Sequence, residues 1–205
     1  MRLVLASTSP ARLATLRAAG VEPLTISPGV DEDAVVAAAG HLEPAAMVEL
    51  LARAKAETVA ESHGSTIDGL ILGGDSAFVI DGIIHGKPHL PEVARERWLR
   101  QRGRTGVLYS GHWLIDHRGG ENHGGVGIVT HAEVTFADVT DAEIDAYIAT
   151  GEPLHVAGAF TIDSLGGPFI ESIVGDPHTV VGLSLPALRN LVRSFGIDWT
   201  DLWNR

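Results

Sequence analysis

Hydroxyl side chains and an arginine gather near the N-terminus, where an anion could bind. Ser7, Thr8 and Ser9 follow a short apolar run and precede Pro10, and Arg12 comes two residues later. Ser9 is a good N-cap and proline suits the first turn, so we expect a helix to start there. A helix start offers unpaired N–H groups, to which the Arg12 guanidinium would add a forked donor for phosphate. An ordinary capped helix with a solvated arginine accounts for the same residues.

Acidic side chains stand out at two further places. Asp31, Glu32 and Asp33 follow one another, and Asp75 interrupts an otherwise apolar run after two glycines. A buried carboxylate is costly unless it is paired or bound to a metal. A strand that ends in a turn with a capping aspartate would explain Asp75 equally well. Carboxylate oxygens at these positions would suit Mg²⁺, which prefers oxygen ligands and keeps several waters.

Two lysines complete the set of candidate residues. Lys87 lies in the tripeptide Gly-Lys-Pro, and Lys55 lies within a segment of helical periodicity at 44–62. Either lysine alone is more typical of a solvated surface position. Together with Arg12, they could instead hold phosphates while the carboxylates hold a metal. That combination fits metal-assisted phosphoanhydride hydrolysis.

Composition and motifs exclude several classes of protein. The chain has 205 residues, no cysteine and a formal net charge of −11. The lack of cysteine excludes thiolate catalysis and Cys-ligated zinc, and the acidic charge argues against nucleic-acid binding. P-loop and Rossmann glycine motifs are absent. We expect no zinc site at the scattered histidines, which the loop composition would place at a solvated surface: His112, His117, His123 and His131.

Alternating strands and helices must position these groups. We expect helices at 10–19, 44–62, 90–103, 140–151 and 184–196, and strands at 3–6, 107–116, 132–139, 158–163 and 168–175. Residues 69–88 are expected to form a strand, a polar interruption at Asp75, a second strand, a turn at Asp81-Gly82 and a third short strand. The expected fold is therefore α/β with a mixed sheet. Without a signal-peptide pattern or an apolar run of about 18 residues, we expect a cytoplasmic protein with no membrane partner.

Seven stretches, in this order, resemble the Maf family of nucleoside triphosphate pyrophosphatases, once described as septum-formation inhibitors. They are STSPAR, VDE, LARAKA, GGDS, GKP, TGEPLHVAGAF and GDPHTVVGLSL. The resemblance runs nearly end to end. It implies one domain over 1–205, with an elongated mixed α/β fold of the inosine-triphosphate-pyrophosphatase type and two lobes around a central cleft. It also implies a homodimer.

The resemblance further implies hydrolysis between the α and β phosphates of a nucleoside triphosphate, with Mg²⁺ or Mn²⁺. The products would be a nucleoside monophosphate and pyrophosphate. Glu32 would help to hold the metal, although Asp31 or Asp33 could take its place. Asp75 would accept a proton from the attacking water and share the metal. The residues that would contact the phosphates are Ser7, Arg12, Lys55 and Lys87.

Three positions depart from the family pattern. Ala11 replaces the first arginine of S-P-R-R, Val156 replaces a lysine, and Asp163 replaces a glutamine expected near the base. Asp163 could accept hydrogen bonds from amino or imino groups of a base, so the preferred nucleotide stays open. The two lost cations favour an alternative, a nucleotide-binding regulator of cell division with little turnover. The retained Asp75 counts against it, because a pure binder needs no water-activating carboxylate.

Overall fold

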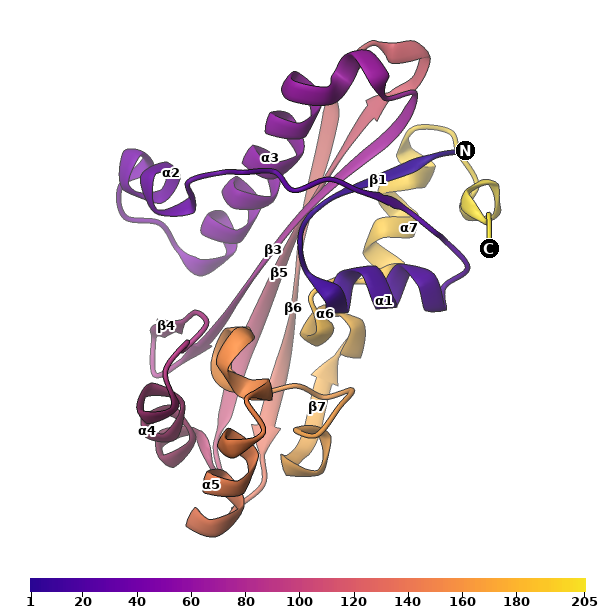
Figure 1. The fold of residues 1–205 in the computed structure, drawn as a ribbon. Coiled ribbons are helices and arrows are strands. Elements are labelled where there is room, and N and C mark those ends of the chain that lie inside the picture. The colour runs from indigo at the N-terminus through magenta and orange to yellow at the C-terminus, as the bar shows by residue number, and fades with distance from the viewer. The chain divides into compact units, whose positions relative to one another are not determined.

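A computed structural model describes the whole chain, residues 1–205, as a seven-stranded sheet flanked by helices (Figure 1). The strand order is β2-β1-β3-β5-β6-β7, and β4 pairs with β3. The strands are β1 (Leu3–Ala6), β2 (Leu24–Thr25), β3 (Gly69–Ile80), β4 (Ile83–His85), β5 (Thr105–His117), β6 (Gly125–Phe136) and β7 (Ile170–Gly175). The α-helices are α1 (Pro10–Ala18), α2 (Glu32–Ala39), α3 (Pro44–His63), α4 (Pro91–Gln101), α5 (Asp141–Ala149), α6 (Pro177–Val181) and α7 (Leu185–Ser194).

The sheet is mixed, as the sequence predicts. Strand β1 runs parallel to both β2 and β3, and its register with β3 pairs Leu3 with Leu70 and Ala6 with Gly73. The pairs β3–β4 and β6–β7 are antiparallel. A turn at Asp81-Gly82 separates β3 from β4, also as predicted, and both residues adopt positive φ there.

The chain divides into two compact units. The first unit comprises 1–75, 110–130 and 182–205, and the second comprises 76–109 and 131–181. In the first unit, β1 is buried on both faces. Leu3 and Leu5 belong to one apolar cluster with residues of α1 and α7, whereas Val4 and Ala6 belong to another with residues of α3. This alternation follows from the two-residue period of a strand and explains why the β1 sequence is apolar throughout.

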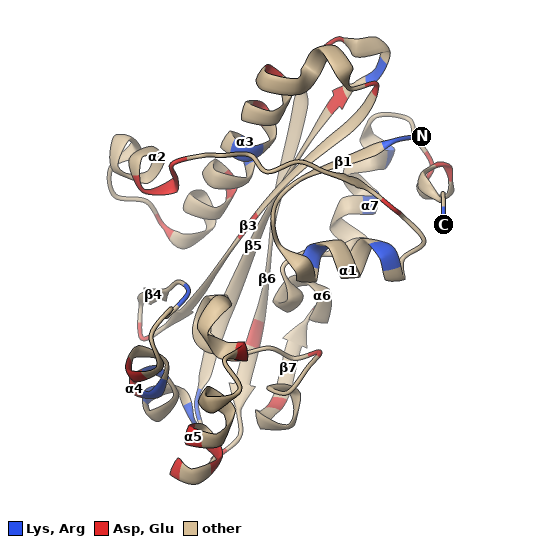
Figure 2. Ribbon diagram, in the orientation of Figure 1, with Lys and Arg blue, Asp and Glu red and all other residues tan.

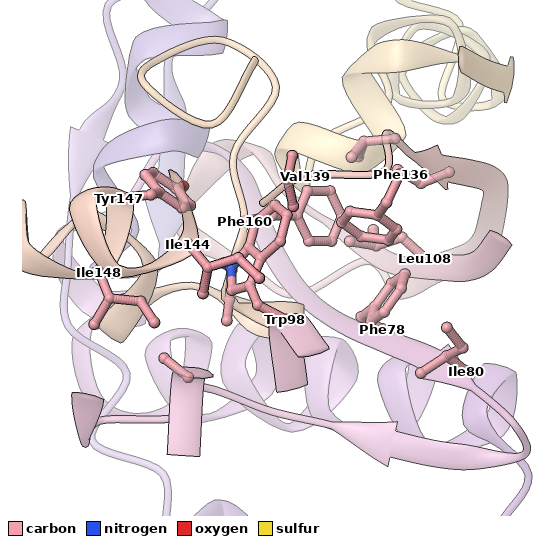
Figure 3. Close-up of a cluster of buried hydrophobic side chains, with 14 of the residues drawn as sticks. Phe78, Ile80, Trp98, Leu108, Phe136, Val139, Ile144, Tyr147, Ile148 and Phe160 are labelled. Carbon is pink, nitrogen blue, oxygen red and sulfur yellow. The ribbon is translucent and has the colours of Figure 1, made fainter. Parts of the chain in front are cut away.

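The second unit has an aromatic core of its own (Figure 3). Phe136 and Phe160 pack edge to face with ring centroids 5.0 Å apart, and Trp98 packs against Phe136 at 5.4 Å. The buried Trp98 indole donates a hydrogen bond of 2.8 Å to the carbonyl of Ala159. Helix α5 of this unit begins with the capping box that the sequence predicts, in which Thr140 and Glu143 bond each other's backbone N–H groups.

The predicted interruption of the strand at Asp75 is wrong. Strand β3 continues through Asp75 from Gly69 to Ile80, so the residue is neither a break nor a strand-end cap. The preceding Gly73 serves helix packing instead. A Cβ at Gly73 would lie 2.0 Å from the Ala52 carbonyl oxygen, so the missing side chain lets α3 approach β3 closely.

Residues 158–163 do not form the predicted strand. A 3₁₀ turn covers Ala157–Ala159, and bends follow. The carboxylate of Glu152 takes the backbone N–H groups of Leu165 and Gly166 and the hydroxyl groups of Thr161 and Ser164. These contacts fold residues 161–166 around one side chain. The carbonyls of Gly158 and Ala159 accept side-chain hydrogen bonds from Gln101 and Trp98, which compete with strand pairing.

Two of the four histidines expected at a solvated surface are buried. His112 and His117 are buried on β5, which extends to His117, whereas His123 and His131 are exposed. No helix in the structure combines the length and the apolar character needed to cross a membrane.

Candidate functional site

The N-terminal hydroxyl-rich turn forms as the sequence predicts. Helix α1 begins at Pro10, and the Oγ of Ser9 accepts a hydrogen bond of 3.4 Å from the backbone N–H of Arg12. The Arg12 side chain is not solvated, because its exposed fraction is 8%. Its Nε donates to the Gly182 carbonyl at 2.8 Å, and its Nη1 donates to the Ser7 hydroxyl at 3.2 Å. These contacts aim a buried guanidinium in one direction.

Lys55 lies buried on the sheet-facing side of α3, contrary to the solvated position that a single helix lysine most often takes. Ala52, three residues earlier, and Ala56, the next residue, are both fully buried. Lys55 therefore lies on the face of the helix that packs against the sheet. Its Nζ lies 2.8 Å from Oε1 of Glu32 and 2.7 Å from Oδ1 of Asp75. One ammonium group thus joins two acidic segments that are far apart in the sequence.

The three acidic residues at the start of α2 make different contacts. The side chain of Asp31 caps α2 and accepts a hydrogen bond of 3.0 Å from the N–H of Ala34. Glu32 and Asp33 are the first two residues of that helix and both are exposed, but it is Glu32 that pairs with Lys55. Figure 2 shows acidic residues at the start of α2 and only basic charge on α1. The geometry therefore favours Glu32 over its neighbours as the carboxylate that acts with Asp75.

Asp75 is nine-tenths buried in the middle of β3. Burial raises its pKa, while the positive charges of Lys55 and Arg12 work against that rise. Burial likewise lowers the pKa of Arg12, against the opposing charges of Asp75 and Glu32. Gly74 makes room for this arrangement, because a Cβ there would lie 3.0 Å from Nε of Arg12. Two cations and two carboxylates thus form one neutral cluster within the first unit.

Five of the seven predicted site residues therefore lie together in the first unit: Ser7, Arg12, Glu32, Lys55 and Asp75. The other two, Lys87 and Asp163, belong to the second unit, where both are exposed. Lys87 follows β4. The carbonyl of its neighbour Gly86 accepts a hydrogen bond from the Arg97 side chain. The backbone N–H of His89 donates to the Leu154 carbonyl at 3.0 Å.

Sequence reasoning missed Gly182, whose carbonyl holds the Arg12 guanidinium. Its φ of +105° is a conformation that side chains rarely adopt, so glycine is suited to this position. Gly182 lies in the stretch GDPHTVVGLSL, one of the seven that resemble the family, but the resemblance gave it no role. Its contact with Arg12 spans 170 residues and is made by a backbone carbonyl, which every residue type carries.

The cluster offers a divalent metal the carboxylate oxygens of two residues. Glu32 and Asp75 each direct one oxygen at Lys55, which leaves a second oxygen on each carboxylate. No group of three or more histidine, aspartate or glutamate side chains is gathered closely enough to hold a metal by itself. Mg²⁺ often binds through one or two carboxylates, with waters and substrate phosphates filling the other positions. The residues present fit such a shared site.

Comparisons with known proteins agree on one family. The family model described as "Maf-like protein" matches residues 2–195. A nucleoside triphosphate pyrophosphatase of Leifsonia xyli is 69% identical over all of this chain and 98% of its own length. A nucleoside triphosphate pyrophosphatase of Corynebacterium jeikeium is 51% identical over 99% of this chain and 100% of its own.

Among solved structures, a nucleoside-triphosphatase (dITP/XTP pyrophosphatase) of Mycobacterium abscessus aligns over 95% of both chains, with 14% identity and a TM-score of 0.40. The family assignment depends on the sequence matches, which span the site residues of both units. The chain belongs to the Maf family.

Proposed function

We propose that this protein is a nucleoside triphosphate pyrophosphatase that hydrolyses the bond between the α and β phosphates. The observation that carries the proposal is the cluster of Arg12, Glu32, Lys55 and Asp75, in which every member but Glu32 is buried. Structural ion pairs seldom place two cations and a carboxylate together in a buried position, since desolvation of each charge is costly. Relatives with this name support the same activity.

The phosphate chain would bind to the cationic side of the cluster. Arg12 offers a guanidinium fixed by Ser7 and Gly182, and Lys55 offers an ammonium beside the reacting carboxylate. The start of α1 adds backbone N–H groups to the same segment. Lys87 in the second unit would supply a further positive charge to the polyphosphate. Positioning and charge neutralisation of this kind account for most of the catalysis of phosphoryl transfer.

Glu32 and Asp75 would hold Mg²⁺ or Mn²⁺ through the carboxylate oxygens that do not face Lys55. When bound, the metal would neutralise charge that develops on the phosphate oxygens. Bound waters and the substrate would complete its coordination.

Asp75 would act as the general base. Water would attack the α phosphorus, one proton would pass to Asp75, and the bond from the α phosphorus to the bridging oxygen would break. The products are then a nucleoside monophosphate and pyrophosphate. A carboxylate whose pKa is raised by burial is a better proton acceptor than one in water, and the positive charge of Lys55 favours its ionised form.

We further propose that Asp163 contributes to the choice of base. It is exposed on the segment that Glu152 organises, and its carboxylate can only accept hydrogen bonds. Amino or imino groups of a base would satisfy it, which favours bases that present such donors.

A screen for pyrophosphate release tests the proposal. Canonical and modified nucleoside triphosphates are supplied with Mg²⁺ or Mn²⁺ to the wild type, to Asp75→Asn and to the control Asp68→Asn. Asp68 is an exposed aspartate next to the start of the same strand. Loss of release in Asp75→Asn alone supports the enzyme. Nucleotide binding without turnover in the wild type would favour the regulator, and release of phosphate without pyrophosphate would contradict the proposed bond.

A further inference from the structure

His112 is fully buried in the middle of β5, and none of the proposed catalytic steps uses it. Its Nε2 accepts a hydrogen bond of 2.9 Å from the backbone N–H of Ser184. Its Nδ1 lies 3.4 Å from the carbonyl oxygen of Ile128. Because a carbonyl only accepts and an N–H only donates, these two partners select the neutral imidazole with its proton on Nδ1.

The residue that His112 holds belongs to a short, tightly constrained segment. Gly182 starts it and presents the carbonyl that accepts from Nε of Arg12 at 2.8 Å. Leu183 follows and is fully buried in the apolar cluster of the first unit. Ser184 ends it and caps α7 through its side chain, which accepts from the N–H of Ala187. The His112 contact therefore lies two residues from the carbonyl that orients Arg12.

We propose that His112 is a positioning residue for Arg12, acting through the segment 182–184. The inference rests on the proposed phosphate contact of Arg12. Without an acceptor at Nε2, the buried N–H of Ser184 would be unsatisfied, and the segment would shift to find another partner. The Gly182 carbonyl would move with it, and the guanidinium would lose one of the contacts that fix its direction.

His117 provides a matched control on the same strand. It is also buried, and its Nδ1 lies 3.1 Å from the carbonyl of Ile67, a residue outside the segment 182–184. Replacing either histidine by leucine removes a buried imidazole from β5 in the first unit. Only the replacement of His112 removes the acceptor for Ser184.

The acceptor itself is tested by two polar replacements of His112. The amide oxygen of glutamine reaches about as far as Nε2, whereas that of asparagine reaches only about as far as Nδ1. His112→Gln should therefore keep the contact with Ser184, and His112→Asn should lose it. This pair decides the question even if His112→Leu does not fold.

The first measurement is independent of turnover. The Nε–H resonance of Arg12, identified by its absence from Arg12→Lys, is recorded in the full chain by ¹⁵N NMR. The expected result is a shifted or solvent-exchanging resonance in His112→Leu and His112→Asn, and a wild-type resonance in His112→Gln and His117→Leu. A wild-type resonance in folded His112→Asn would overturn the inference, whether or not the protein proves to be a pyrophosphatase.

The second measurement links the position of Arg12 to substrate binding. In His112→Asn we expect KM for the best nucleotide to rise about tenfold, the scale of one hydrogen bond to a charged group, with a smaller change in kcat. Combined with Arg12→Ala, the same change should have no further effect on KM, because the two act on one contact. A KM rise of equal size in His117→Leu, or full additivity with Arg12→Ala, would overturn the inference.

Discussion

The Nζ atom of Lys55 lies 2.7 Å from Oδ1 of Asp75, and the contact joins the buried face of α3 to the middle of β3. Gly73 makes it possible, because any side chain there would collide with the Ala52 carbonyl and keep the helix away from the strand. The same ammonium also reaches Glu32. The backbone packing of helix on strand thus brings the proposed base, a proposed metal ligand and a phosphate-binding cation together.

The pairing predicts a large cost for removing the lysine. Lys55→Met removes the cation that pairs with the buried Asp75, and breaking a buried ion pair by removing one partner costs about 3–5 kcal/mol of the free energy of unfolding. Arg53→Met, an exposed change on the same helix, should cost less than about 1 kcal/mol, because its pair with Glu57 is at the surface. Urea unfolding of both variants measures the difference. Equal losses would contradict the buried pairing.

The acidic residues before α2 can be distinguished by metal dependence. Glu32→Gln should raise the Mn²⁺ concentration needed for half-maximal pyrophosphate release by about tenfold, because one carboxylate ligand is lost. Asp33→Asn should leave it unchanged, since Glu32, not Asp33, pairs with Lys55 beside Asp75. The measurement is a Mn²⁺ titration at fixed nucleotide. A larger effect of Asp33→Asn would assign the metal to the neighbouring residue.

The ionised carboxylate of Glu152 is expected to contribute to stability in a pH-dependent way. Burial alone would raise its pKa, but hydrogen bonds from Thr161, Ser164 and Tyr147, with the N–H of Leu165, lower it from 4.5 to about 2. A carboxyl group with a depressed pKa in the folded state stabilises the fold above its unfolded pKa. That contribution should be present at pH 7 and should be lost as the pH falls from about 4.5 toward 2.

The check on Glu152 is urea unfolding of wild type and Glu152→Gln at several pH values. The difference in the free energy of unfolding should be largest at pH 7 and should shrink below pH 4.5. Glu92→Gln serves as a control, because Glu92 is exposed in the first turn of α4. A difference between wild type and Glu152→Gln that stays constant down to pH 3 would contradict the role of the ionised carboxylate.

Asp163 should influence which nucleotide is preferred. Asp163→Gln introduces a donor beside the acceptor, so the ranking of nucleotides by kcat/KM should change while the best kcat stays within a few-fold. The control is Asp138→Asn, another exposed aspartate of the second unit. Identical relative kcat/KM values across a panel of nucleotides would rule out the proposed base contact.

Local signals in the sequence predicted the helix starts well. Ser9 with Pro10 and the Thr140–Glu143 pair cap their helices as expected, since capping depends on residues only three positions apart. Alternation of strands and helices predicted the α/β class, and the hairpin-like middle of the chain predicted the mixed sheet. Residue type and position singled out Arg12, Lys55 and Asp75, and the family motifs gave each of them a role.

Long-range contacts explain what the sequence could not predict. Lys55 has the sequence context of a solvated helix lysine, and only the approach of Asp75 and Glu32 from other segments makes its burial tolerable. His112 is buried for the same reason, through a backbone N–H 72 residues away. The failed strand at 158–163 shows the converse case, in which Trp98 and Gln101 of α4 bond the carbonyls of Ala159 and Gly158 that a strand would need.

The most direct test of the account is the rate of pyrophosphate release by Asp75→Asn. The variant keeps the size of the side chain but cannot accept the proton, so kcat should fall by about 10²–10⁴-fold while nucleotide binding is retained. The wild type and Asp68→Asn should release pyrophosphate and nucleoside monophosphate in equal amounts. Wild-type kcat in Asp75→Asn would contradict the proposed role of the cluster.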